Sequence, residues 1–212
     1  MNYIDITPTI SKKTAVFPGD VPFSRKVSLN HEPGTPICLS SITTTLHLGA
    51  HTDAPSHYDP SGEPIHSRSL QPYMGKCQVV DLSKLSLKNT RISFSHWNNR
   101  SVTSPRILFK THTFPDHNSW NDDFASFDPK LIEYFASKKV ELIGIDTPSI
   151  DPPGDKILPA HKMVYAHNLS VLEGIILGNV DEGEYKLIAL PLPIQDADAS
   201  PVRAILITGD FK

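Results

Sequence analysis

Short stretches in which apolar and polar residues alternate, or in which β-branched residues cluster, recur along the chain. Each stretch is bounded by Gly, Pro, Asn, Asp or Ser, the residue types that commonly end strands. The pattern predicts strands at Ile37–Leu48, Cys77–Leu82, Arg106–Thr111, Glu141–Asp146, Lys186–Pro191 and Val202–Thr208.

Two further segments follow a helical pattern. Asp128 can cap a helix that begins at Pro129, where proline suits the first helical position. The apolar residues of this helix fall on one side: Leu131, Ile132, Phe135 and Ala136. A second helix is expected to begin at Pro159 and to carry His161. Because strands outnumber helices while the two types interleave, we predict an α/β fold with a largely β core and outer helices.

The composition is that of an ordinary globular protein. Hydrophobic residues make up 39% and charged residues 20%, and no repeat or low-complexity tract divides the chain, so we expect residues 1–212 to form one domain. The net charge of −3 is too small to attract nucleic acid or anionic lipid. We therefore expect a small-molecule partner or a second copy of the chain, and no nucleic-acid or membrane partner.

The N-terminal residues lack a basic start followed by an apolar run, and no stretch reaches the length of a membrane span, so we expect a cytoplasmic protein. Cys38 and Cys77 are far apart and form no metal-type pair. We expect both to be buried, reduced thiols with a structural role only.

The segment from residue 46 to residue 57 carries the most chemistry. It contains three histidines and one aspartate: His47, His51, Asp53 and His57. Imidazole and carboxylate are the ligand types that suit zinc and related divalent ions. A helix would put His47 and His51 on one face, but Gly49 and Pro55 favour a strand that runs into a turning loop. The alternative is a polar loop whose histidines only cap strands; the density of ligand-type residues favours a site.

A metal site needs ligands from elsewhere in the chain, since this loop leaves coordination positions to fill. Glu173 stands in an apolar run from Val171 to Leu177, where a carboxylate is costly to bury unless it is paired or metal-bound. A solvent-facing glutamate on an edge strand is the alternative. His161 and His167 are two further candidates, and their spacing does not decide between them. A solvated surface role is expected for the remaining histidines: His31, His66, His96, His112 and His117.

The chain resembles the cyclase-type metal-dependent hydrolases, and within them the bacterial kynurenine formamidases. The resemblance begins at YIDIT and the FPGD turn of Phe17–Asp20, and continues through HLGAHTDAPSHY and LIGIDTPSIDP. It then covers the stretch from His161 to Glu173, followed by GEYKLIALPL and DASPVRAIL, so that nearly the whole chain is included.

This resemblance implies a swivelling β/β/α fold and a homodimer or higher assembly. It also implies metal-dependent hydrolysis of N-formyl-L-kynurenine to L-kynurenine and formate, as in tryptophan degradation, with two Zn²⁺ ions per subunit or Mn²⁺ instead. By the resemblance, one ion is bound by His47, His51 and Asp53, and the second by Asp53, His161 and Glu173. His57 would be the catalytic acid/base, and Phe17 would contact the aromatic ring of the aryl formamide.

Two positions depart from the family pattern. Ala50 replaces a threonine in GTH, and Phe17 replaces the tryptophan that usually contacts the substrate. Neither change removes a metal ligand, but Phe17 is a smaller ring without an indole N–H. Phe17 therefore keeps open a rival function on the same scaffold, hydrolysis of a cyclic amide by an isatin-hydrolase-like enzyme. A non-catalytic metal-binding module is the rival from a different class.

Overall fold

A seven-stranded mixed sheet forms the centre of the protein. The computed structural model describes residues 2–209. The strand order is β1-β13-β11-β5-β7-β9-β10. Strands β5, β7, β9 and β10 are parallel, whereas β11 is antiparallel to β5 and β13, and β1 is antiparallel to β13. The bounds are β1 (Asn2–Asp5), β5 (Met74–Asp81), β7 (Arg106–Lys110), β9 (Leu142–Ile145), β10 (Ser170–Leu172), β11 (Gly183–Ile188) and β13 (Ile205–Thr208).

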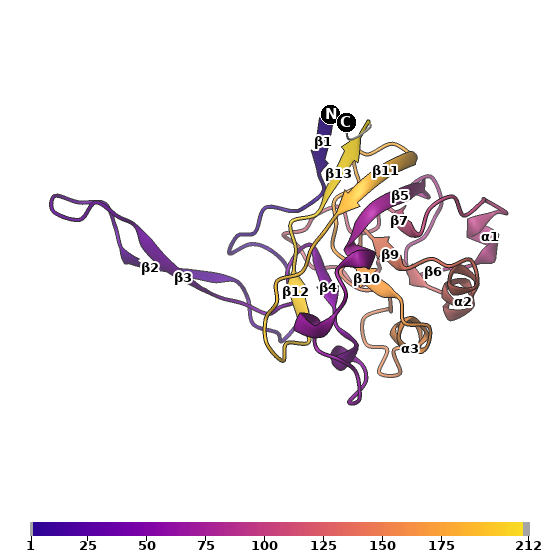
Figure 1. Ribbon diagram of the computed structural model, residues 1–212, viewed down its shortest axis with the longest axis horizontal. Helices are drawn as coiled ribbons and strands as arrows, with labels where there is room; N and C mark the ends of the chain where they lie inside the picture. The colour runs from indigo at the N-terminus through magenta and orange to yellow at the C-terminus, as the bar shows by residue number, and fades with distance from the viewer. Residues whose placement is uncertain (1, 210–212) are drawn as a thin grey trace.

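Helices cover one face of this sheet (Figure 1). They are α1 (Phe94–Trp97), α2 (Pro129–Ser137) and α3 (Pro159–Ala166). Helix α2 lies in the crossover from β7 to β9, and α3 in the crossover from β9 to β10. The Asp128 carboxylate accepts a hydrogen bond from the Lys130 amide at 2.9 Å, which caps α2 as its sequence predicts.

Alternation along the strands separates two apolar cores. Ile107 and Phe109 of β7 face the helices, whereas Leu108 between them faces the other side of the sheet. The second core also contains Ile6 and Ala50, from segments that lie across that face. Because a strand directs successive side chains to opposite faces, the short apolar strands supply both cores at once.

Shorter elements complete the fold. Strand β4 (His51–Asp53) pairs with β12 (Ala199–Pro201), and β6 (Arg91–Ile92) pairs with β8 (Ser126–Phe127). Three single 3₁₀ turns are formed by Pro55–His57, Ile65–Ser67 and Gln71–Tyr73. Among residues 2–209, no helix is both long enough and apolar enough to cross a bilayer.

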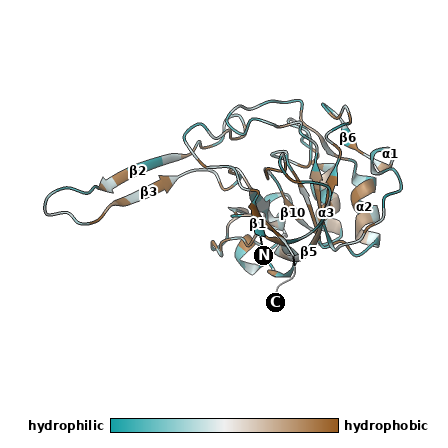
Figure 2. Ribbon diagram, turned by 90° about the horizontal axis from the view of Figure 1, so that it is seen from above, coloured by the Kyte–Doolittle hydropathy of each residue, from teal (hydrophilic) through white to brown (hydrophobic). Residues whose placement is uncertain are grey.

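A two-stranded arm projects from this body. Strands β2 (Ser24–Leu29) and β3 (Leu39–Thr43) pair with each other, and every residue in them is exposed. The ribbon extends far beyond the rest of the chain in two perpendicular views (Figures 1 and 2). Several of its side chains are large and apolar, and Ile42 is 63% exposed. The body therefore leaves the apolar groups of the arm uncovered.

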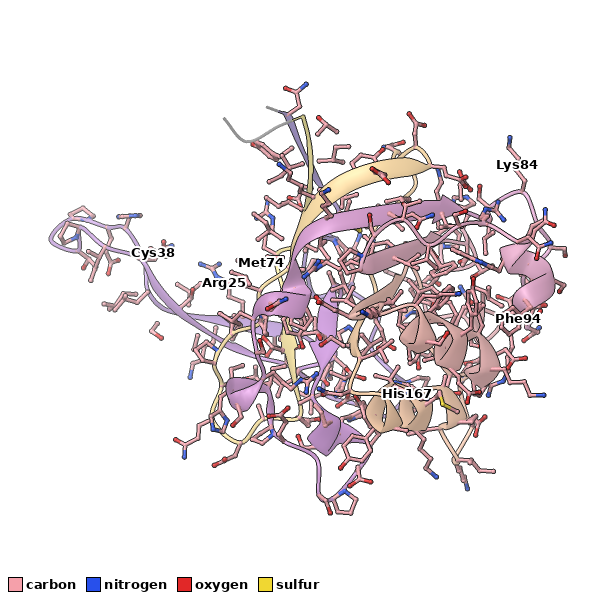
Figure 3. The ribbon with its side chains drawn as sticks, turned by 45° about the vertical axis from the view of Figure 1, so that its right-hand side comes forward. Arg25, Cys38, Met74, Lys84, Phe94 and His167 are labelled. Atoms are coloured by element: carbon pink, nitrogen blue, oxygen red, sulfur yellow. The ribbon has the colours of Figure 1, made fainter. Side chains whose placement is uncertain are left out.

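The predicted fold class is confirmed, with differences in detail. All six predicted strands exist, but Ile37–Leu48 contains only the five-residue β3, because the chain leaves the arm and turns toward the body after Thr43. The short strands β1, β2, β4, β6, β8, β10 and β12 were not predicted, since pairing with distant segments decides them rather than a local pattern. The expectation that Cys38 is buried is wrong: it lies on the exposed arm (Figure 3), whereas Cys77 is buried.

Candidate metal centre

The histidine-rich segment turns sharply between the arm and β4. Gly49 has a positive φ of 58°, which favours glycine, and a Cβ there would make a tight contact of 3.1 Å with Cγ of Pro8. Pro55 then opens a 3₁₀ turn that ends at His57. Turns at Gly49 and Pro55 are what the sequence predicts. They bring His47 and His57 to one place, with their ring centroids 4.2 Å apart.

Glu173 reaches the same place from the carboxyl end of the parallel strand β10. Its backbone exchanges two hydrogen bonds with His51, of 2.9 and 3.1 Å. Glu173 is 2% exposed, and its Oε1 accepts a hydrogen bond from the Ile150 amide at 2.7 Å. A solvent-facing role for Glu173 is therefore excluded, although β10 is an edge strand.

His161 enters from helix α3. Its Nδ1 lies 2.8 Å from Oδ2 of Asp151, and the other oxygen of Asp151 accepts from Arg91 at 2.9 Å. This chain of contacts sets the orientation of the His161 ring and directs its Nε2 toward the cluster. The other candidate on this segment, His167, is exposed at the far end of α3, as Figure 3 shows.

Asp53 stands at the centre of the cluster. Its Oδ1 lies 2.9 Å from Nδ1 of His47 and 3.5 Å from Nε2 of His51, and its Oδ2 lies 3.4 Å from Nε2 of His161. Glu173 closes the ring, with Oε2 3.1 Å from Nε2 of His51 and Oε1 3.6 Å from Nε2 of His161. The structure thus brings together all five side chains that the resemblance implies as metal ligands.

The donor set fits a divalent cation. The Nδ1–H of His51 donates to the Gly49 carbonyl at 2.9 Å, so Nε2 presents its lone pair to the carboxylates of Asp53 and Glu173. Neither His51 Nε2 nor Asp53 Oδ1 has a hydrogen-bond partner among the described residues, although both atoms are buried. Buried acceptors that face one another need a positive charge between them. Two groups of three could supply such a site: His47, Asp53 and His57, and His51, Asp53 and Glu173.

The electrostatics show the same demand for positive charge. Burial raises the pKa of the Asp53 carboxyl, but the attraction of His47 and hydrogen bonding with His161 outweigh it and hold that pKa well below its usual value. Burial lowers the pKa of His47, yet the charge of Asp53 and the hydrogen bond with Asp198 raise it to about 10. Protons on the imidazoles or a divalent cation can supply the charge that the carboxylates require.

His57 lies at the edge of the cluster and is more open than the rest. Its side chain is 34% exposed, and its Nδ1 lies 3.5 Å from Oδ2 of Asp198. The same oxygen of Asp198 lies 3.0 Å from Nε2 of His47. Burial, and then the positive charges of His47 and His161, lower the pKa of His57, although Asp53 opposes them. Asp198 is a site residue that the sequence alone did not indicate, since it stands in an unremarkable DAD stretch.

The cluster opens into a cavity of about 690 Å³. Phe17 lines this cavity, together with the aromatic residues Phe114, Trp120 and Phe124 of a later loop. His117 also lines it and is half-buried, so the expected solvated surface position for this histidine is wrong. The loop folds back onto the N-terminal segment, where the Ala15 amide donates to the His117 carbonyl at 2.9 Å. Because this contact joins distant segments, the local sequence pattern did not indicate the aromatic side of the cavity.

Comparison with known proteins identifies the family. Residues 4–152 match the family model described as "Cyclase: Putative cyclase". The chain belongs to the cyclase family. It is 41% identical to a kynurenine formamidase of Bordetella pertussis, over 95% of this chain and 96% of that protein.

Solved structures resemble this cyclase-family member over almost its whole length. A structure described as a potential metal-dependent hydrolase with cyclase activity has a TM-score of 0.84 and 25% identity, covering 97% of this chain and 96% of its own. An isatin hydrolase bound to the product analogue thioisatinate has a TM-score of 0.82 at 20% identity, covering 98% of this chain and 92% of its own. The latter likeness shows the shared fold.

Proposed function

We propose that this cyclase-family protein is a metal-dependent arylformamidase that hydrolyses N-formyl-L-kynurenine to L-kynurenine and formate. The observation that carries the proposal is the buried cluster around Asp53 at the edge of a large, partly aromatic cavity. The 41% identity to a kynurenine formamidase along nearly the whole chain supports the choice of substrate.

We infer that the cluster holds two divalent ions, with zinc as the first choice and manganese as the second. His47, His51 and Asp53 would bind one ion, and Asp53, His161 and Glu173 the other. Asp53 suits a bridging role because its two oxygens face different histidines. When bound, the metal supplies Lewis-acid chemistry, which makes water a competent nucleophile near neutral pH and polarises the formyl carbonyl.

The side chains of the protein then handle the protons. Water adds to the formyl carbon, the C–N bond breaks, and the amine nitrogen must receive a proton as it leaves. His57 is the candidate acid/base, because it lies beside His47 and remains partly open to the cavity. The Asp198 carboxylate, 3.5 Å from Nδ1 of His57, would hold that ring so that its other nitrogen faces the substrate.

We also propose that the protein is a homodimer in which the arm of one copy packs against the other copy. A two-stranded ribbon is at best marginally stable by itself in water. The arm exposes Val27, Leu29, Leu39 and Ile42, which are between 42% and 63% exposed. A second copy of the chain would bury these side chains without any additional protein.

The decisive experiment measures turnover of N-formyl-L-kynurenine by the purified protein before and after chelation. Zinc and manganese are added back separately, bound metal is counted, and isatin serves as the competing substrate. We expect formation of kynurenine that chelation abolishes and metal restores. Bound metal with turnover of isatin alone would contradict the assigned substrate, and a protein that binds no metal would contradict the mechanism.

A further inference from the structure

The cavity has two chemically different parts. One carries the imidazoles and carboxylates of the cluster, and the other is aromatic, formed by Phe17, Phe114, Trp120 and Phe124. Phe114 and Phe124 are 5% and 2% exposed, so they are already covered by protein. Phe17 is 51% exposed and Trp120 is half-buried, which leaves these two rings with surface that a ligand can contact.

Trp120 contacts three other aromatic rings. Its centroid lies 5.5 Å from that of Phe17, 5.8 Å from that of Phe114 and 5.9 Å from that of Phe124, all in edge-to-face geometry. The indole N–H donates to Oδ1 of Asp122 at 2.7 Å. These contacts set the plane of the indole before any ligand arrives, which reduces the entropy lost on binding.

The loop that carries Trp120 is fastened at both ends. The Ala125 amide donates to Oγ1 of Thr113 at 2.9 Å, and the Thr111 amide donates to the buried Asp146 carboxylate. In its middle, the His117 carbonyl accepts from Ala15, two residues before Phe17. Phe17 and Trp120 therefore belong to one preformed surface, although they come from distant parts of the chain.

We propose that Trp120 is a specificity-determining residue that selects substrates with an aromatic ring on the amide nitrogen. This inference rests on the proposed amide hydrolysis and extends it to a residue outside the metal cluster. An aromatic ring adds edge-to-face or stacking attraction to the apolar burial that any ring of its size would provide. A saturated ring of the same size gains only the burial.

The test compares formanilide with N-cyclohexylformamide, which replaces the aromatic ring by a saturated one. Trp120→Leu keeps an apolar side chain without a ring, and Trp120→Phe keeps a ring. We expect Trp120→Leu to raise KM for formanilide roughly tenfold and to change kcat less. For N-cyclohexylformamide, both KM and kcat should change less than KM for formanilide. Trp120→Phe should recover most of the preference. The control is Trp97→Phe, because Trp97 is buried in the helix-side core.

A binding measurement makes the proposal independent of turnover. The chain contains two tryptophans, so the Trp97→Phe protein has Trp120 as its only indole. Titration with L-kynurenine, on zinc-loaded and on chelated protein, should change the Trp120 fluorescence with saturation. The same titration of the Trp120→Phe protein, in which Trp97 is the indole that remains, should give no such signal.

The outcomes separate this inference from the proposed function. A wild-type protein that hydrolyses both formamides, with an unchanged preference after Trp120→Leu, would overturn the role of Trp120 and leave amide hydrolysis intact. A zinc-loaded wild-type protein that hydrolyses neither formamide, and not N-formyl-L-kynurenine either, would overturn the proposed function, and a saturable fluorescence change would then still support aromatic binding at Trp120. No fluorescence response in an active protein would overturn the inference.

Discussion

Asp53 and Glu173 are buried carboxylates that face the imidazoles of the cluster. Each is 2% exposed; Asp53 lies near nitrogens of three imidazoles, and Glu173 near nitrogens of two. An ionised carboxylate at such a position is tolerable only with compensating positive charge. His57 differs from them, since its exposure and its neighbour Asp198 suit proton transfer rather than charge neutralisation.

That difference predicts two separate phenotypes. Glu173→Ala should lose bound metal and activity together, because it removes a buried carboxylate from the cluster. His57→Ala should keep its metal but lose turnover by about 10²- to 10⁴-fold, the usual contribution of a positioned acid/base group. Metal counting by mass spectrometry, together with initial rates, distinguishes the two variants. The matched control is His167→Ala, because His167 is exposed and lies outside the cluster. Full activity in His57→Ala would remove it from the mechanism.

Asp198 should matter through the rings of His57 and His47 rather than through the fold. Asp198→Asn keeps the size of the side chain but removes the charge that lies 3.5 Å from Nδ1 of His57. We expect kcat to fall by roughly 10- to 100-fold while KM changes little, as for other residues that orient a functional group. Asp196→Asn changes an exposed carboxylate of the same loop and should leave the rates unaltered. Equal rates for the two variants would show that Asp198 has no positioning role.

At the scale of elements, the site depends on where strands stop. Strand β10 ends at Leu172 and Glu173 follows it. In β4, His51 pairs with Glu173 through an isolated backbone bridge, and Asp53 stands two residues further along. The two segments approach so closely there that a Cβ on Gly174 would lie 2.1 Å from the Gly49 carbonyl oxygen. Glu173, at the carboxyl end of the parallel strand β10, is thereby brought together with a segment that lies more than a hundred residues earlier.

The arm is the element whose role can be tested by assembly state. Ile42→Asp places a charge among the exposed apolar side chains of the ribbon, so we expect the dimer to dissociate to monomers. Light scattering coupled to size-exclusion chromatography measures the mass. Ile157→Asp is the control, because Ile157 is 67% exposed on the body and outside the arm. A wild-type monomer, or a dimer that persists in Ile42→Asp, would contradict an interface formed by the arm.

At the scale of the whole molecule, metal binding and stability should be linked. A ligand that binds only the folded state at 1,000 times its dissociation constant stabilises that state by about 4 kcal/mol. For a chain of this length, chelation should then lower Tm by roughly 8–16 °C. Scanning calorimetry with and without chelator measures the shift. The Tm of the Glu173→Ala protein should change very little on chelation. A wild-type Tm that does not change on chelation would argue against a buried metal.

Much of the architecture could be predicted because it follows from local patterns. The strands β5, β7 and β9 are short apolar runs between turn residues, and α2 has an N-cap, a proline and one apolar side. The candidate ligands could also be predicted, because ligand-type residues are dense around His51 and because Glu173 interrupts an apolar run. Each of these two signals lies within a single stretch of about a dozen residues or fewer.

The sequence by itself therefore determined six of the strands, helices α2 and α3, and the residue types of the cluster. The local pattern left His161 and His167 open, and the tertiary structure showed that His161 faces Asp53; the tertiary structure alone brought Asp198 to His47, which is 151 positions earlier. It likewise brought Trp120 to Phe17 and left the arm uncovered. The physical reason is that periodicity and turn chemistry act between neighbours, whereas a site is made by contacts that close loops of a hundred residues or more and leave no local pattern.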